Sequence, residues 1–426
     1  MSGMAAEPDG RRERPDREIV DTTDVWRPER DELAVDAPGE RTGELEGVPL
    51  SSSEEPLGAE RRRGHVDDTH LRLSLVTLGD PGQRTGGYRY HRMMARAAGT
   101  HGAAIRFASV PAWPWPLPTV RAGSTLRCAT EGSDGILLDS IAAAFVAPWI
   151  GRVARPVVAV VHQPPGGMDL GPVRTTLQGA LDRRAYRHVA GAIAASESLV
   201  EDLRRAGVAA DRIRFVPPGS DVPVATGPPL DLRRGRSVAV LCVANWSPRK
   251  GILELLDAFA TVPEGAGTLW LVGATDTDRS YAERVHRRLS APDLAGRVVA
   301  RGTVPVEQVG RMYRSADVFA LCSFVDPYGT AWAEAIGAGL PVIGWRTANL
   351  PRLAEHGREA LMAEPGDGAG LASALRAITT DPDLRERLTA GARRRAATIP
   401  TWKRSAERFF DAVRDLVEDA PRSRQR

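Results

Sequence analysis

Residues 317–345 constrain the fold more than any other stretch of this chain. A short apolar run over 318–322 predicts a buried strand, and the residues at 326–329 break it. Small residues dominate over 330–338, which predicts a helix packed closely on a sheet. A glycine then ends the helix, and a second apolar run starts at Pro341. The stretch therefore predicts a β-α-β unit of a parallel sheet.

Two carboxylates stand eight residues apart in this unit. Asp326 lies in the loop after the first strand, and Glu334 lies about a turn into the helix. Such a loop lies at the carboxyl end of a parallel sheet, where open α/β sheets bind ligands. The free N–H groups and the positive dipole end of the helix suit a phosphate. An Ala- and Gly-rich helix offers little structural reason for a carboxylate at Glu334.

Length and charge narrow the class of protein. The chain has 426 residues, enough for two or three domains, and carries 57 basic against 54 acidic residues. This balance gives no reason to expect a nucleic-acid partner. The three cysteines show no pairing or metal spacing, so we expect reduced thiols and no metal site. Without a secretory signal or an apolar run long enough to span a bilayer, we expect a cytoplasmic protein, and peripheral contact with a membrane stays open.

Alternating strand and helix patterns divide the chain into α/β regions. Composition predicts a disordered tail over 1–69, and a Rossmann-like domain follows over 70–228. A linker rich in proline, glycine and charge covers 222–237. A second Rossmann-like domain follows over 229–400, and residues 401–420 predict an amphipathic helix. We predict two doubly wound domains with the ligand in the cleft between them, and leave the oligomeric state open.

Two features of the first domain carry alternatives. Trp113 and Trp115 alternate with prolines over 112–123, which predicts an extended segment. The tryptophans either cap the domain core, or line an acceptor cleft or touch lipid. His162 stands directly beyond a β-rich run over 156–161, and therefore on the ligand side of an open sheet. A structural histidine is the alternative there.

The candidate site residues describe a nucleotide-diphosphate-sugar site when they are taken together. Lys250, between a strand and a helix, is a point charge for phosphate. Glu334 has the character to accept two hydroxyl hydrogen bonds, as a ribose diol needs, and Asp326 could do the same for sugar hydroxyls. Gly329 and Thr330 would present backbone N–H groups to a diphosphate. The simpler alternatives are a surface lysine at 250 and a helix cap at Asp326.

Five motifs in fixed order resemble a known family. They are the TGGY loop at 85–88, His162, PPGSD at 217–221, NWSPRKG at 245–251 and DPYGTAWAEAIGAGLPVIG at 326–344. With NLPRLAEHGREALMAEPGD at 349–367, they are similar to the retaining glycosyltransferases of family 4, which have the GT-B fold. The resemblance covers about residues 71–420. It implies sugar transfer from a nucleotide-sugar donor to an acceptor hydroxyl, with the nucleotide sugar as substrate and no cofactor or metal.

The resemblance also implies roles for single residues. Lys250 would bind the donor diphosphate, Asp326 would contact the transferred sugar, and His162 would lie near the reaction centre. Glu334 would bind the ribose hydroxyls. The further donor-binding candidates are Gly86, Gly87, Asn245, Arg249, Tyr328, Gly329 and Thr330. The last helix of such folds crosses back to the first domain.

Two site positions depart from the family pattern, and Ala348 and Asn349–Leu350 stand in altered form where two glycines are usual before the proline. Asp326 stands where a glutamate is usual, and Asn245 stands where an arginine is usual. We expect Arg249 to supply the missing positive charge. Two alternatives to transfer follow: an epimerase or phosphorylase on the same fold, or a catalytically silent protein that kept the donor site.

Overall fold

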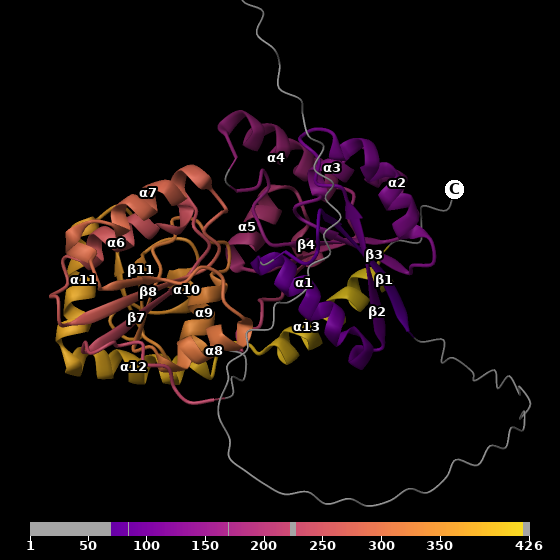
Figure 1. Ribbon diagram of the computed structural model, residues 1–426. Helices are drawn as coiled ribbons and strands as arrows, with labels where there is room; N and C mark the ends of the chain where they lie inside the picture. Colours follow the sequence, from indigo (N-terminus) through magenta and orange to yellow (C-terminus); the bar gives the residue numbers. More distant parts are fainter. Residues whose placement is uncertain (1–69, 84, 169, 222–226, 421–426) are drawn as a thin grey trace, which may run out of the picture. The chain divides into compact units, whose positions relative to one another are not determined.

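The structure is a computed structural model that describes residues 70–83, 85–168, 170–221 and 227–420 (Figure 1). The predicted tail over 1–69 and the positions 222–226 of the predicted linker lie outside the described residues. The described part forms two parallel six-stranded sheets with flanking helices, which confirms the predicted fold class.

The first sheet is built from the amino-terminal half of the described chain. Its strands are β1 (Leu71–Leu78), β2 (Ala103–Val110), β3 (Gly135–Asp139), β4 (Val157–Val161), β5 (Gly191–Ala194) and β6 (Ile213–Phe215), in the order β2-β1-β3-β4-β5-β6. Its helices are α1 (Gly86–Ala97), α2 (Pro118–Thr130), α3 (Ala143–Val146), α4 (Pro172–Tyr186) and α5 (Glu197–Arg205), with 3₁₀ turns at Ala98–His101, Ile150–Arg152 and Ala210–Arg212. Every residue of β3 and β4 is buried, as expected of central strands in a parallel sheet.

The second sheet is built from the carboxyl-terminal half. Its strands are β7 (Val238–Val243), β8 (Gly267–Val272), β9 (Val298–Ala300), β10 (Val318–Ala320), β11 (Val342–Trp345) and β12 (Ala360–Ala363), in the order β12-β11-β10-β7-β8-β9. Its helices are α6 (Ile252–Ala260), α7 (Arg279–Leu289), α8 (Val306–Ser315), α9 (Thr330–Gly337), α10 (Leu350–Leu353), α11 (Gly368–Thr380) and α12 (Pro382–Ala396), with 3₁₀ turns at Pro248–Lys250 and Pro292–Leu294. The predicted β-α-β unit is β10-α9-β11, with Phe319 paired to Val342.

The last helix, α13 (Trp402–Glu418), packs on the first sheet rather than on the second. It contacts α1, β4 and β5, and in Figure 1 its yellow ribbon lies among the indigo elements of the amino-terminal half. Its Phe409 and Phe410 are fully buried in one core cluster with Leu73 and Tyr90. An apolar stripe at helical spacing gives α13 the face that packs there.

One local prediction is wrong. Residues 112–123 were expected to be extended, but the second part of that segment is the start of α2. Pro118 stands in the first turn of α2, where its fixed φ suits a helix and its missing N–H costs nothing. The proline run therefore starts a helix instead of prolonging an extended strand.

Candidate functional site

Each sheet reverses its strand order once, and the candidate residues follow the strands at these two points. In the second sheet the reversal falls between β7 and β10. Lys250 lies in the loop after β7, and Asp326 lies in the loop after β10. In the first sheet the reversal falls between β1 and β3, and the loop after β1 leads into α1, which begins with Gly86 and Gly87. Open α/β sheets bind ligands at such points because the flanking loops diverge there.

Lys250 and Asp326 form an ion pair across this reversal. Lys250 Nζ lies 2.5 Å from Asp326 Oδ2, and both side chains are mostly buried. Burial alone would raise the pKa of Asp326, but the charge and hydrogen bond of Lys250, together with Arg249 and the N–H of Gly329, outweigh it and lower the pKa. Gly251, at φ +63°, makes the close approach feasible, because a Cβ there would lie 2.1 Å from the carbonyl oxygen of Cys322.

The second oxygen of Asp326 caps the start of α9. Gly329 donates its N–H to Asp326 Oδ1 at 2.8 Å, so the helix-cap alternative describes a real contact of this side chain. Gly329 is left-handed at φ +81°, and a Cβ there would lie 2.3 Å from the Trp332 ring. The loop therefore presents the first turn of α9, with Thr330 at its start, beside the Lys250–Asp326 pair.

Glu334 is buried and accepts two hydrogen bonds. It is 5% exposed, and the Tyr313 hydroxyl donates to its Oε2 at 3.2 Å. Arg89 Nη1, from α1 of the amino-terminal half, donates to its Oε1. Burial raises the pKa of Glu334, and the guanidinium of Arg89 opposes the rise. Arg89 was not predicted, because nothing in its local sequence indicates a partner 245 residues away.

The two glycines at the start of α1 lie between His162 and the start of α9. A Cβ on Gly86 would lie 3.5 Å from Thr330 Oγ1, and a Cβ on Gly87 would lie 3.5 Å from His162 Cδ2. Thr85 caps α1 by accepting the N–H of Tyr88. Residues predicted from distant parts of the sequence are therefore neighbours in the structure.

A buried polar cluster that was not predicted from the sequence lies behind His162. His91 Nε2 lies 3.0 Å from Asp139 Oδ2, and Thr77 Oγ1 donates to the same oxygen at 2.7 Å. The rings of His91 and His162 are 4.8 Å apart. Burial, with a contribution from His91, lowers the pKa of His162 to about 3, so His162 is neutral at pH 7. One signal was available: Asp139 ends β3 next to the strand that His162 follows.

One ring nitrogen of His162 is available for a hydrogen bond. Its Nε2 is buried and has no hydrogen-bond partner among the described residues. Its backbone N–H donates to Ser140 Oγ at 3.1 Å, which fixes the start of the loop that follows β4. A neutral imidazole with an unused nitrogen is able to accept or donate one hydrogen bond, depending on its tautomer.

The other predicted site residues shape loops. Asn245 Oδ1 accepts the N–H of Ala274 at 3.0 Å, and Arg249 Nη1 donates to the Val325 carbonyl at 3.3 Å. The Tyr328 hydroxyl donates to the carbonyl of Pro218 at 3.1 Å, so it binds the PPGSD segment of the other half. Direct contact of these three side chains with a ligand stays a prediction.

Trp113 and Trp115 do not cap the core. They are 44% and 37% exposed, so the core-capping alternative is wrong. The guanidinium of Arg121 lies 5.8 Å from the centre of the Trp113 ring. The aromatic residues of this core are Phe145 and Tyr186, and the tryptophan packed against it is Trp149.

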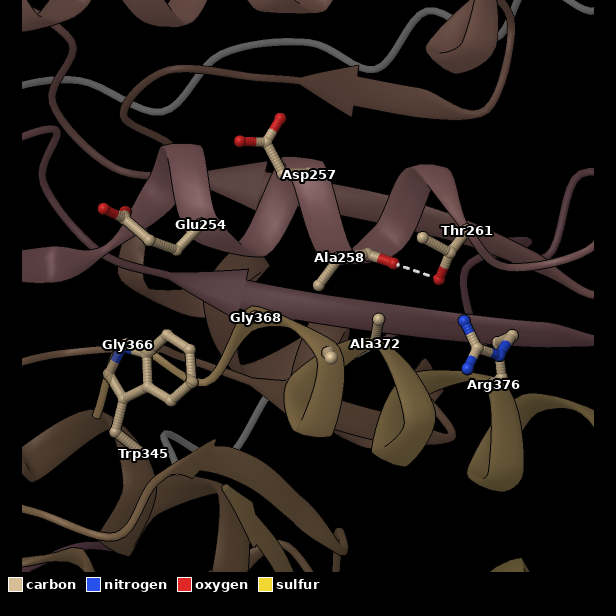
Figure 2. A pocket seen from close by; sticks show the side chains of 10 residues that line it. Glu254, Asp257, Ala258, Thr261, Trp345, Gly366, Gly368, Ala372 and Arg376 are labelled. Carbon is tan, nitrogen blue, oxygen red and sulfur yellow. Dashed lines mark hydrogen bonds between the residues drawn. The ribbon is translucent and has the colours of Figure 1, made fainter. Parts of the chain in front are cut away.

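A separate groove lies between α6 and α11 (Figure 2). Glu254 and Asp257 line it from α6, and Ala372 and Arg376 line it from α11. None of its lining residues is among the candidate site residues. We therefore do not assign the donor chemistry to this groove.

The described residues contain neither a cluster of metal ligands nor a helix able to cross a membrane. Within these ranges, no three histidine, cysteine, aspartate or glutamate side chains gather in a way that could hold a metal ion. No helix in the described part of the chain is both long and apolar enough to cross a bilayer.

Two families of known sequence match consecutive parts of the chain. Residues 61–219 match the "Glycosyl transferase 4-like domain", and residues 237–381 match "Glycosyl transferases group 1". Mannosylfructose-phosphate synthase of Agrobacterium fabrum is 28% identical over 50% of this chain and 50% of its own length. A lipopolysaccharide core biosynthesis glycosyltransferase, LpsD, of Rhizobium meliloti is 32% identical over 42% of this chain and 49% of its own length. The chain thus spans about half the length of these relatives.

Solved structures share the fold. Sucrose-phosphate synthase from Thermosynechococcus elongatus matches 81% of this chain and 99% of its own, with a TM-score of 0.69 and 20% identity. HepE of Anabaena, solved in complex with UDP, matches 81% of this chain and 100% of its own, with a TM-score of 0.65 and 20% identity. At these identities the likeness establishes the two-domain architecture.

Proposed function

Because the chain belongs to the family 4 glycosyltransferases, we propose that it transfers a sugar from a nucleotide-diphosphate-sugar donor to an acceptor hydroxyl. One observation carries the proposal. Lys250, after β7, pairs with Asp326, after β10, and the start of α1 lies beside both His162, after β4, and Thr330 at the start of α9. We propose that Lys250 and the start of α9 contact the diphosphate of the donor and that Glu334 contacts its ribose.

The proposed chemistry follows from the charges at the site. As the bond from the anomeric carbon to the diphosphate breaks, negative charge develops on the leaving oxygen. Lys250 and the free N–H groups at the start of α9 stabilise that charge. The acceptor hydroxyl attacks from the face that the leaving group departs, which retains the anomeric configuration, and a diphosphate oxygen takes its proton.

Asp326 and His162 face the sugar in this proposal. Donor diphosphate takes over the Lys250 cation, and Asp326 is then free to accept sugar hydroxyls through Oδ2. His162, neutral because its pKa is about 3, offers Nε2 to a sugar hydroxyl rather than a positive charge to the oxocarbenium-like centre. A neutral ring avoids repulsion with the positive charge that develops there.

The donor is proposed by class. HepE was solved with UDP and with UDP-glucose, and we take uridine diphosphate sugars as the first donors to try. The leaving-group charge is assigned to protein groups, so we also propose that turnover does not require a divalent metal. Chelation by EDTA would then leave the rate unchanged, and a strict metal requirement would contradict this part.

A panel of UDP-glucose, GDP-mannose and ADP-glucose tests the function. A ligand at 100 times its Kd stabilises a protein by about 2.7 kcal/mol, which a thermal-shift assay detects. We expect one nucleotide sugar to raise the Tm and to release its nucleoside diphosphate. Stabilisation without turnover would indicate a silent binding protein, and dependence on free phosphate would indicate a phosphorylase. No stabilisation by any nucleotide or nucleotide sugar would refute the proposal.

A further inference from the structure

Arg89 stands at the ribose end of the candidate site although it belongs to the other half of the chain. Its Nη1 donates to Glu334 Oε1, and its guanidinium carbon lies 5.5 Å from the centre of the Trp402 ring. Trp402 is itself fixed, because its backbone N–H donates to Asp221 Oδ1 at 2.8 Å. Three segments, α1, α9 and the start of α13, therefore meet at this guanidinium.

The acceptor capacity of Glu334 limits what Arg89 can be doing. An ionised carboxylate has about four lone-pair positions, two on each oxygen. Arg89 takes one position on Oε1, and Tyr313 takes one on Oε2. One position is left on each oxygen, and a vicinal diol needs one on each. Arg89 thus leaves room for ribose at Glu334.

Charge explains why a cation is needed there. Glu334 is 5% exposed, and a carboxylate buried without a partner favours its neutral form. A neutral carboxyl group would turn one of its oxygens into a donor and lose part of the match to two hydroxyls. Arg89 opposes this by pairing with the ionised form, and Tyr313 fixes the second oxygen.

We infer that Arg89 is a positioning residue for ribose: it holds Glu334 ionised and oriented so that the two remaining acceptor positions receive the 2′- and 3′-hydroxyls of the donor nucleotide. The inference rests on the proposed function, since it assumes that Glu334 binds ribose. It adds that recognition of ribose by the carboxyl-terminal half requires a residue of the amino-terminal half.

The test compares a ribonucleotide with its 2′-deoxy counterpart. The probe is whichever of UDP, GDP and ADP binds the wild type most tightly, with the matching 2′-deoxynucleotide, measured by calorimetry. Arg89→Met removes the guanidinium and keeps most of the stem. We expect it to weaken binding of the ribonucleotide about tenfold and that of the deoxynucleotide much less. The preference for the ribonucleotide over the 2′-deoxynucleotide should therefore be largely lost in Arg89→Met.

Matched variants separate this from general damage. Arg96→Met removes one exposed arginine of the same helix and should keep the wild-type preference. Arg89→Lys should restore part of the preference, because it returns a cation. If Arg89→Met does not fold, Arg89→Gln decides, since it keeps a polar N–H donor on a shorter side chain and removes the charge.

Each outcome has one meaning. A wild-type preference that survives in Arg89→Met, or in Arg89→Gln where that variant decides, overturns the inference and leaves the proposed function standing. A wild type that binds nucleotides without preferring the 2′-hydroxyl overturns the ribose assignment of Glu334 and the inference with it. Equal loss of both nucleotides in Arg89→Met assigns Arg89 to the phosphates and also overturns the inference.

Discussion

Substitution of Lys250 should lower the free energy of unfolding, apart from any effect on catalysis, because it leaves the buried carboxylate of Asp326 without its cation. In Lys250→Met the carboxylate keeps one hydrogen bond, from the N–H of Gly329, and loses its cation. Breaking a buried ion pair from one side costs about 3–5 kcal/mol. The two side chains keep 14% and 15% exposure, so we expect the lower end of that range, about 3 kcal/mol.

The cost should depend on pH with a definite sign. In the wild type the pKa of Asp326 is lowered, so its contribution to stability is present above the unfolded pKa and is lost as pH falls through the folded pKa. In Lys250→Met burial dominates and the folded pKa rises above the unfolded value. The penalty is then full at neutral pH and shrinks as pH falls through the raised folded pKa towards the unfolded value of about 4, below which Asp326 is protonated in both states.

Urea unfolding followed by tryptophan fluorescence measures this difference, with Trp332 buried beside the capped turn. Lys250→Met/Asp326→Asn is the control, because asparagine keeps the oxygen that accepts from Gly329 and carries no charge. We expect the double variant to unfold within about 1 kcal/mol of the wild type but to bind nucleotide as poorly as the single variant. A single variant as stable as the wild type at pH 7, or a penalty independent of pH, would refute the reasoning.

Three further predictions concern the loops and the core. Gly329→Ala should cost about 1–2 kcal/mol from its left-handed φ alone, with more from the Trp332 contact, and should weaken nucleotide binding in calorimetry. Phe409→Ala should lower the free energy of unfolding by about 3–5 kcal/mol in urea titrations, because that ring is fully buried between α13 and the first sheet. Burial raises the pKa of Asp182 to about 7, above its unfolded value, so ionising it costs stability as pH rises from about 4 to 7. Asp182→Asn should therefore be more stable than the wild type by about 1–3 kcal/mol at pH 8 and equal to it near pH 4, as chemical denaturation would show.

Local patterns were enough to predict the fold. The β10-α9-β11 unit follows from apolar runs, turn residues and small helix residues within 29 positions, and each acts over a few residues. The start of α2 was missed for a related reason. Proline favours an extended neighbour and also the first turn of a helix, and the pattern of residues 112–123 does not separate these.

Contacts between residues far apart in the chain could not be predicted from the sequence. Lys250 and Asp326 were each predicted as site residues, but their ion pair joins positions 76 apart and depends on the strand order of the second sheet. The Asp139–His91 contact depends in the same way on the first sheet. Arg89 is the clearest case, since its partner lies in the other half of the chain.

The central claim is that Lys250 and Glu334 act together on a nucleotide-sugar donor, and donor turnover by the two alanine variants tests it most directly. The rate of nucleoside diphosphate release from the best donor of the panel would be measured for the wild type, Lys250→Ala and Glu334→Ala, with folding checked by circular dichroism. We predict a loss of about 100-fold or more in each folded variant, since each removes a charged contact to the donor. Folded variants that both turn over the donor at near wild-type rates would contradict it.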